Sequence, residues 1–331
     1  MIMLFKPKFI FFFLVINIFF TPFLSTLNAN ENFDSWLSSY KIYALKNGIS
    51  EKTLNNAFLD VKFLEQVIKY DRKQPEFFED TITYIKKRSN KLRVTTGKIL
   101  LNKNKKLFNE IEKKFSVEKE ILIALWGIET NFGKHVGKMD IISSLATLSY
   151  DKRRSDFFSS QLLTLLRLLD SNLINKTDLY GSWAGAYGNF QFMPSTIKNY
   201  AIDYNGDNKI ELKKSLEDSL ASAANYINKI GWKKNQPCFY RVKLTKKIEK
   251  KYLNSSARTI DNRLKVSNWK TKGVISYDGI DISSNLKAAL ILPDGTPDSP
   301  AFLVFQNYEK ILKWNRSLRF GISVCTLASM I

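Results

Sequence analysis

One segment near the middle of the chain constrains the fold more than any other. The run ILIALWGI at 121–128 is apolar throughout, and Glu129 follows it directly. A helix that is apolar on all sides has to be buried, so we predict a buried helix over 116–133 with Ser116 as its N-cap. Burying a carboxylate without a partner is costly. Glu129 is therefore either an unusual structural residue or a carboxyl group that the apolar setting keeps protonated for a function.

Glu129 has an apolar wall on its own face of the predicted helix. Residues three and four positions apart are neighbours on a helix, and here these are Trp126 and Leu125, with Leu122 one turn beyond. Loss of water disfavours the charged form and raises the pKa of a carboxyl group, which suits a general acid near neutral pH. The alternative is a glutamate at the end of the helix that faces solvent or pairs with a lysine.

The charge and the histidine content restrict the chemistry. Lys and Arg number 51 against 31 Asp and Glu in 331 residues, so the formal net charge is +20. Such a surplus favours anionic partners such as nucleic acid, a membrane surface or an acidic polymer, although scattered lysines also fit a compositional bias. The single histidine, His135, lies in a Gly-flanked loop with no Ser or Cys motif beside it. Neither a histidine-dependent triad nor a zinc site is predicted, and catalysis is expected to depend on carboxylates.

Residues 1–29 have the order of regions found in a secretory signal peptide. Lys6 and Lys8 precede a long apolar stretch, and the small residue Ala29 marks the predicted cleavage site. The stretch is also long enough for an uncleaved anchor in the inner membrane. No cysteine lies near the cleavage site, so lipid attachment there is excluded. We therefore expect export to the periplasm.

The chain contains two cysteines, Cys238 and Cys325. An exported protein can pair them, but their spacing says nothing about their distance. A disulfide and two free thiols both remain open.

The rest of the chain divides into helical and β-rich stretches. Helical spacing dominates an N-terminal part, 30–115, and a central core, 116–236. Short β-rich runs with turn residues occupy 237–305, and the last two, AALIL and AFLVF, are split by turn residues and resemble a hairpin. Residues 306–331 return to helical spacing as a single final helix. The prediction is a mainly α (α+β) fold with a small β-rich insertion near the C-terminus.

Within these stretches, several elements are predicted individually. Helices are expected at 153–172 and 215–232, and a Gly-rich loop at 181–197 leads into a helix near Pro194. The first helix carries an apolar stripe that is typical of a core-facing side. The stripe consists of Phe33, Trp36, Leu37, Tyr40 and Ala44.

The segment 203–218 carries oxygen donors at alternate positions, as an EF-hand calcium loop does. The donors at its start are Asp203, Asn205, Asp207 and the carbonyl group of Lys209. The pattern departs from an EF-hand at Asn208, where glycine is usual, and at Lys214, where a closing glutamate is expected. A closing carboxylate then has to come from Glu217 or Asp218. The alternative is an Asx-rich turn that binds no metal.

Long motifs occur in a fixed order along the chain. They are DRKQPEF at 71–77, ALWGIETNFGKHVGKMDIISSLATLSYDKRRSDFF at 124–158, GSWAGAYGNFQFMPSTIKNYAIDYNGDNKIEL at 181–212 and PAFLVFQNYEKILKWNRS at 300–317. Together they resemble the lytic murein transglycosylase B family over nearly the whole mature chain. The resemblance implies a lysozyme-like helical catalytic domain with a small β region. It also implies an enzyme that cleaves the β-1,4 bond between N-acetylmuramic acid and N-acetylglucosamine in peptidoglycan.

The resemblance also implies a mechanism with one acid. Glu129, in the motif G-I-E-T, matches the catalytic glutamate, which protonates the leaving oxygen and then takes the proton of the muramoyl C6 hydroxyl. A 1,6-anhydro ring results, without a second carboxylate and without a cofactor. The absence of Asp and Glu from 181–197 is compatible with this scheme, although Asp140 and Asp151 remain candidates for the second carboxylate of a usual glycosidase.

Further site residues are implied by the same resemblance. The substrate-binding set is Ser182, Gln191, Arg153, Arg154, Asn315, Trp314 and Phe320. Arg153 and Arg154 match a basic pair that meets the anionic peptide stem. Trp314 and Phe320 stand where the family often has tyrosine, so stacking on sugar is kept and a hydroxyl is lost. A structural calcium ion is implied at Asp203, Asn205, Asp207, Lys209 and Glu217.

Other functions are weighed against this hypothesis. A hydrolytic muramidase would cut the same bond with water, and a non-catalytic protein would only hold the glycan. The expected partners are peptidoglycan strands, with proteins of cell-wall synthesis or division as further candidates. A nucleic-acid binder conflicts with the export signal.

Overall fold

The computed structural model describes residues 23–73, 79–279, 282 and 285–331. Residues 1–22 of the predicted signal peptide lie outside the described residues. The helices, in chain order, are α1 (Phe23–Lys46), α2 (Glu51–Ala57), α3 (Glu65–Arg72), α4 (Thr81–Arg88), α5 (Lys91–Lys103), α6 (Lys105–Phe115), α7 (Lys119–Thr130), α8 (Ile141–Tyr150), α9 (Ser155–Asp170), α10 (Pro194–Tyr200), α11 (Leu216–Lys229), α12 (Val266–Thr271), α13 (Gln306–Trp314) and α14 (Leu318–Met330). Among the described residues, no helix has the length and apolar character needed to cross a membrane.

The strands are short and most of them lie late in the chain. They are β1 (Met139–Asp140), β2 (Tyr180–Gly181), β3 (Phe239–Leu244), β4 (Leu253–Asn254), β5 (Leu264–Lys265), β6 (Val274–Ser276), β7 (Lys287–Ile291) and β8 (Ala301–Val304). Helices therefore dominate and strands gather in one late region, which confirms the mainly α prediction.

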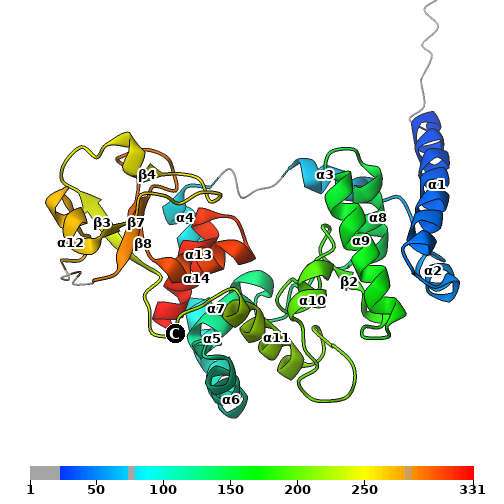
Figure 1. Ribbon diagram of the computed structural model, residues 1–331, viewed down its shortest axis with the longest axis horizontal. Coiled ribbons are helices and arrows are strands. Elements are labelled where there is room, and N and C mark those ends of the chain that lie inside the picture. Colours follow the sequence, from blue (N-terminus) through cyan, green and yellow to red (C-terminus); the bar gives the residue numbers. More distant parts are fainter. Residues whose placement is uncertain (1–22, 74–78, 280–281, 283–284) are drawn as a thin grey trace, which may run out of the picture.

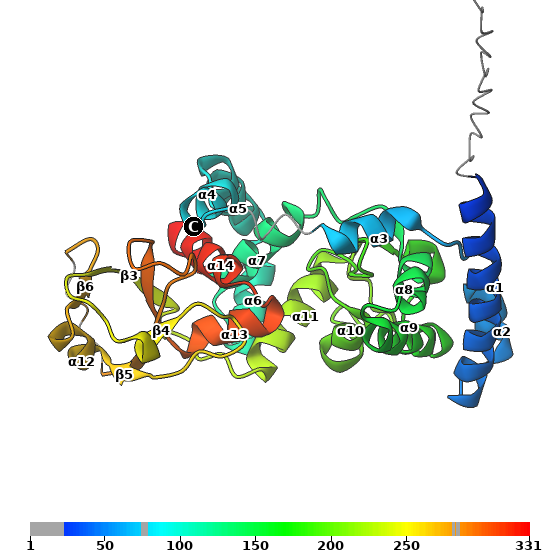
Figure 2. The same cartoon turned by 90° about the horizontal axis from the view of Figure 1, so that it is seen from above.

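The elements form two lobes, which Figures 1 and 2 show side by side. The helical lobe contains α1–α3, α8 and α9. The sheet lobe contains α4–α7, α13, α14 and β3–β8, and α10 and α11 lie between the two lobes. The chain enters the helical lobe first, crosses to the sheet lobe, returns at β1 and crosses again after α11. The sheet lobe is thus built from two stretches that are far apart in the sequence.

The first helix packs as its sequence predicts. Phe33, Leu37, Tyr40 and Ala44 are all buried, while Trp36 is partly buried and stacks on Tyr40 with ring centroids 5.1 Å apart. The spacing of these apolar residues therefore predicted the face that α1 presents to α8.

Helix α7 is the buried helix that the apolar run predicts. Every residue from Ile121 to Gly127 is buried, and α7 packs against α5, α6, α11 and α14. Ser116 does not cap it. Ser116 has a left-handed backbone (φ 53°) and ends α6, so α7 begins at Lys119, with Glu118 at the N-cap position.

The sheet in the sheet lobe has the strand order β4-β7-β8-β3-β6, and β5 pairs with β7. The predicted hairpin is present, because β7 and β8 pair antiparallel with Leu290 opposite Leu303. Both faces are covered. Leu290 and Leu303 pack in one apolar cluster with Trp269 of α12, and their strand neighbours pack in another with Tyr308 of α13. Successive side chains of a strand point to opposite faces of the sheet. The strands β7 and β8 therefore pack against α12 on one face and against the C-terminal helices on the other.

The C-terminal stretch forms two helices, which corrects the prediction of a single helix. Helix α13 ends at Trp314, because Asn315 takes an extended backbone (φ −138°, ψ 122°). Ser317 then caps α14 by accepting a hydrogen bond from the amide of Phe320. The spacing of the apolar residues alone would continue the helix. The cap by the Ser317 side chain instead starts a new helix, so the chain changes direction between α13 and α14.

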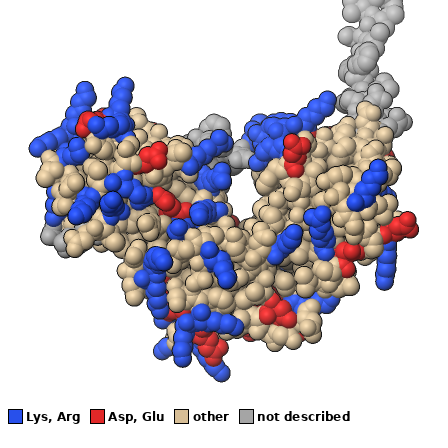
Figure 3. All heavy atoms as spheres, in the orientation of Figure 1, with Lys and Arg blue, Asp and Glu red and all other residues tan. Residues whose placement is uncertain are grey.

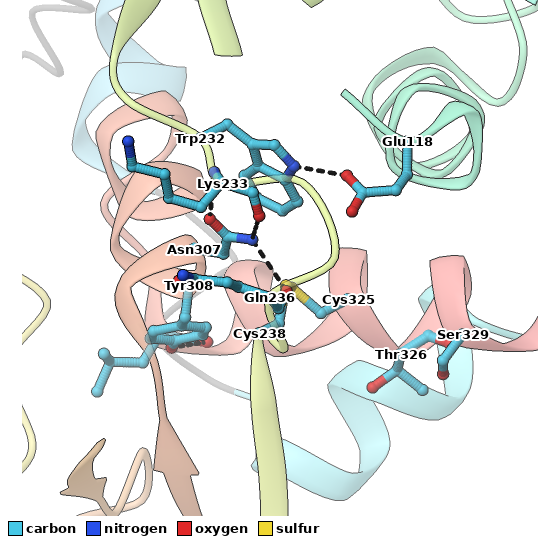
Figure 4. The surroundings of a disulfide bond; sticks show 11 residues. Glu118, Trp232, Lys233, Gln236, Cys238, Asn307, Tyr308, Cys325, Thr326 and Ser329 are labelled. Atoms are coloured by element: carbon cyan, nitrogen blue, oxygen red, sulfur yellow. Dashed lines mark hydrogen bonds between the residues drawn. A yellow bond between two sulfur atoms is a disulfide. The ribbon is translucent and has the colours of Figure 1, made fainter. Parts of the chain in front are cut away.

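A disulfide closes the junction between sheet and helices. Cys238, which directly precedes β3, is bonded to Cys325 of α14, with the Cα atoms 6.2 Å apart. Figure 4 shows that the segment leading to Cys238 is also held by Asn307, whose amide donates to the carbonyl groups of Lys233 and Gln236. The pairing that spacing left open is therefore decided by the fold.

We predict that removal of this disulfide destabilises the protein. The bridge closes a separation of 87 residues, and its loss by a Cys238→Ser/Cys325→Ser double substitution should cost about 3 kcal/mol of unfolding free energy. Urea denaturation with and without reductant measures the effect. The double variant is the control and should not respond to reductant, whereas a wild-type midpoint unchanged by reductant would contradict the prediction.

Candidate functional site

Glu129 lies in the last turn of α7, at the point where the core helix ends. Its side chain is half-buried. The helix stops because Asn131, Phe132 and Gly133 in succession take left-handed backbone angles (φ 50°, 59° and 80°). Leu122 and Leu125 on the same side are fully buried. The carboxylate therefore stands at the rim of the apolar core rather than free in solvent.

A polar partner of Glu129 comes from the other end of the chain. The indole Nε1 of Trp314 donates a hydrogen bond to Glu129 Oε1 at 2.9 Å. Trp314 is the last residue of α13, so the break after α13 delivers it to α7. The sequence suggested a sugar-stacking ring at this position and did not reveal this contact, because the two residues are 185 positions apart.

An aromatic cluster surrounds Trp314. Tyr226 of α11 stacks on it with ring centroids 5.1 Å apart and planes at 28°. Phe190 and Phe192 of the Gly-rich loop meet the indole edge-to-face at 6.1 and 5.2 Å. The hydroxyl of Tyr226 also donates to the carbonyl of Lys313 at 3.0 Å. Three elements thus fix the indole that contacts Glu129.

Asn189 is a buried link between α7 and the Gly-rich loop that the sequence reasoning missed. Its Oδ1 accepts from the indole of Trp126 at 3.1 Å, and its backbone carbonyl accepts from the hydroxyl of Thr130 at 2.8 Å. Its Nδ2 donates to Ser219 Oγ of α11 at 3.1 Å. An asparagine in a Gly-rich loop carries no signal that it is 6% exposed, so only the fold identifies it.

The Gly-rich loop carries the predicted residues Ser182 and Gln191. Ser182 Oγ accepts from the amide of Ala186 at 2.9 Å. Gln191 has a left-handed backbone (φ 51°), and its Nε2 donates to the carbonyl groups of Gly188 and Val136. Both side chains are partly exposed. Each therefore shapes the loop and still reaches the surface.

Close backbone contacts hold this loop in place. A Cβ atom at Gly188 would collide with the carbonyl oxygen of Leu212, and Gly188 has φ +77°, so only glycine fits there. The neighbouring amide of Asn189 donates to the same carbonyl at 2.7 Å. The glycine thus allows the loop to lie directly on the segment before α11.

The remaining aromatic and polar predictions lie near α13 and α14. Asn315 follows Trp314 directly and is partly exposed. Phe320 is only 3% exposed and packs in the main core. A ring so buried has no free face for a sugar, which corrects the expectation that Phe320 stacks on substrate.

The predicted basic pair is held by an aspartate. Asp71 of α3 is 2% exposed and accepts from Arg153 Nε at 2.7 Å and from a guanidinium N–H of Arg154. Arg72 extends the cluster to Asp151 at 2.8 Å. The side chains of Arg153 and Arg154 stay 44% and 39% exposed. Asp71 therefore holds both arginines from the protein interior, while part of each arginine side chain is exposed to solvent.

The predicted calcium ligands Asp203, Asn205 and Asp207 share one turn, and their side-chain oxygens accept hydrogen bonds from backbone amides of the same loop. Asp203 Oδ1 accepts from the amide of Gly206 at 2.7 Å, as an Asx-rich turn does. Glu217 is exposed. The next residue, Asp218, is fully buried, and its carboxylate accepts from the amides of Tyr204 and Glu211 at 2.9 and 3.0 Å. In the part of the chain that the structure describes, no acidic, His or Cys cluster has the arrangement of a metal site.

Figure 3 shows the surface hollowed between the two lobes, with Lys and Arg side chains on both sides of the hollow. A half-buried carboxylate with a fixed donor, next to a loop of partly exposed polar side chains, defines a site of the carboxylate-dependent glycosidase kind.

Comparison with known families agrees with this description. The family model described as Transglycosylase SLT domain matches residues 32–329. The chain therefore belongs to the transglycosylase SLT family.

Individual relatives share this fold. Membrane-bound lytic murein transglycosylase B of Escherichia coli K12 is 38% identical over 142 residues, which cover 43% of this chain and 39% of that protein. The chain thus aligns with about two fifths of that relative. SltB3 of Pseudomonas aeruginosa, in complex with NAG-NAM-pentapeptide, superposes with a TM-score of 0.82 at 35% identity, over 89% of this chain and 78% of that one.

A further structure is the Escherichia coli lytic transglycosylase Slt35 in complex with calcium. Its TM-score is 0.72 at 27% identity, over 91% of this chain and 92% of that one. These likenesses confirm the predicted lysozyme-like, mainly α fold and the resemblance to the B-type lytic transglycosylases.

Asp71 should make stability depend on pH. Burial alone would raise its pKa, but the hydrogen bonds and charges of Arg153 and Arg154 outweigh burial and hold the pKa below the ordinary value of 3.8. A lowered folded-state pKa stabilises the fold above the unfolded value, and this contribution is lost as pH falls through the folded pKa. We expect Asp71→Asn to cost about 2 kcal/mol at neutral pH and to flatten the loss of stability below pH about 4.

Denaturation in urea at several pH values tests this expectation. Asp151→Asn is the matched control, because Asp151 pairs with the exposed Arg72, and its loss should be smaller. Equal effects of the two substitutions at every pH would refute the assignment.

The loop at 203–218 gives a second matched pair. Asp218→Asn should cost about 2 kcal/mol, because the new amide group opposes backbone N–H donors. Glu217→Gln should change stability by less than about 0.5 kcal/mol. Thermal melts with calcium or chelator complete the test, and a calcium-dependent rise in Tm that Glu217→Gln abolishes would show Glu217 to be a ligand after all.

Proposed function

We propose that the protein is a lytic transglycosylase, which cleaves the β-1,4 bond between N-acetylmuramic acid and N-acetylglucosamine in peptidoglycan. Membership of the transglycosylase SLT family supports this function. SltB3, the relative at 35% identity, has been solved in complex with NAG-NAM-pentapeptide and with NAG-anhNAM-pentapeptide. The second of those ligands contains an anhydro sugar, which is the kind of product that the proposed reaction forms.

The single observation that carries the proposal is the position of Glu129. A half-buried carboxyl group at the end of an apolar helix, with one oxygen fixed by Trp314, suits transfer of a proton in both directions. As acid, Glu129 protonates the glycosidic oxygen while the bond from C1 to that oxygen breaks. As base, it takes the proton of the C6 hydroxyl while O6 bonds to C1. The carboxyl group ends protonated again, and no water is consumed.

Because the attacking hydroxyl group belongs to the sugar that is cleaved, catalysis depends mainly on how the site orients that sugar. A hydroxyl group of the same sugar has a high effective concentration at C1, so the site mainly has to hold the sugar. We assign this task to Ser182, Gln191 and Asn315, which are partly exposed on the Gly-rich loop and after α13. The exposed parts of Arg153 and Arg154 suit carboxylates of the peptide stem.

The location and the partners follow from the same proposal. Peptidoglycan lies outside the cytoplasm, so the signal peptide predicted at 1–29 fits an exported, periplasmic enzyme. The formal charge of +20 suits an anionic wall or membrane surface and implies binding that weakens with salt. Proteins of cell-wall synthesis or division remain candidate partners.

Analysis of released muropeptides by mass spectrometry tests the function. The purified mature protein should release products with anhydromuramoyl ends, each lighter by one water than a hydrolytic product. Glu129→Gln should lower the rate by about a thousandfold. Glu120→Gln, on the first turn of the same helix, is the matched control and should retain activity. Reducing muramoyl ends would instead indicate a hydrolytic muramidase, and full activity of Glu129→Gln would exclude the assigned acid.

A further inference from the structure

We infer that Trp314 is a positioning residue that assigns different roles to the two oxygens of Glu129. This inference rests on the proposed function. The indole nitrogen only donates hydrogen bonds, and it donates to Oε1 at 2.9 Å. Oε1 therefore acts as an acceptor in both protonation states of the carboxyl group. The transferable proton is then held on Oε2.

This assignment names the atom that reacts in each step. Oε2 gives its proton to the glycosidic oxygen as the bond to C1 breaks. The same Oε2 takes the proton from the C6 hydroxyl as O6 bonds to C1. Between the two steps the carboxylate is charged, and the hydrogen bond from Trp314 to a charged acceptor is stronger than one to a neutral acceptor. The indole therefore stabilises the intermediate form more than either end state.

The indole can perform this task only because it cannot turn away. Tyr226 covers one face of Trp314, with ring centroids 5.1 Å apart. Phe192 meets it edge-to-face at 5.2 Å. The hydroxyl of Tyr226 is tied to the carbonyl of Lys313 at 3.0 Å. A ring packed in this way is held as a fixed donor to Glu129.

The chain contains a second Trp–Glu hydrogen bond that provides a matched control. At the opposite end of α7, the indole of Trp232 donates to Glu118 Oε2 at 2.6 Å (Figure 4). Eleven residues of helix place Glu118 about 16 Å from Glu129. The two bonds share their chemistry and differ in their distance from the reacting atoms.

Kinetics of Trp314→Phe and Trp232→Phe on soluble glycan strands separate positioning from packing. Trp314→Phe keeps an aromatic ring and loses the donor, so kcat should fall about 10- to 100-fold with KM nearly unchanged. Trp232→Phe should lower Tm and leave kcat near the wild-type value. Equal kcat for wild type and Trp314→Phe, or equal losses in both variants, would overturn the inference.

A spectroscopic measurement tests the bond without activity. In protein labelled with ¹⁵N-tryptophan, the indole N–H signal of Trp314 is identified by its loss in Trp314→Phe. That signal should shift upfield in Glu129→Gln, because an amide oxygen accepts more weakly than a carboxylate, while the Trp232 signal stays in place. An unmoved Trp314 signal would refute the inference. If the signal moves but the wild type releases no anhydro products, the proposed function fails and the bond stands.

Discussion

Burial of α7 is the constraint on which the rest of the site depends. An apolar helix of this kind is stable only when other elements cover every side, and α5, α6, α11 and α14 do so. These helices come from three separate parts of the chain, so covering α7 also brings those parts together. Glu129 is placed where this cover ends, and its half-buried state is a direct result.

The site is held by contacts between side chains and loops rather than by one rigid element. Asn189 ties the Gly-rich loop to Trp126 and Thr130 of α7, and to Ser219 of α11. Trp314 ties the end of α13 to Glu129. Because each of these links crosses between elements, a loss of packing at the junction of α11 and α13 would misplace the donor without touching the carboxylate.

Several charged residues in or beside the predicted binding motifs stabilise the fold. The buried carboxylate of Asp71 accepts hydrogen bonds from Arg153 and Arg154, and the buried carboxylate of Asp218 accepts them from backbone amides. A buried carboxylate requires such donors, whereas Glu217 is exposed and needs none. Motif position alone does not separate these cases, because adjacent residues on a helix point in different directions.

The sequence by itself determined the local features of this protein. Apolar spacing predicted α1 and α7, β-rich runs split by turn residues predicted the hairpin of β7 and β8, and the G-I-E-T motif singled out Glu129. These features depend on residues that are close together in the chain, so periodicity and motifs record them. The tertiary structure decided the break before α14, the bond from Trp314 to Glu129, the role of Asn189 and the pairing of Cys238 with Cys325. Each of these depends on burial or on contacts between distant segments, which exist only once the helices have packed.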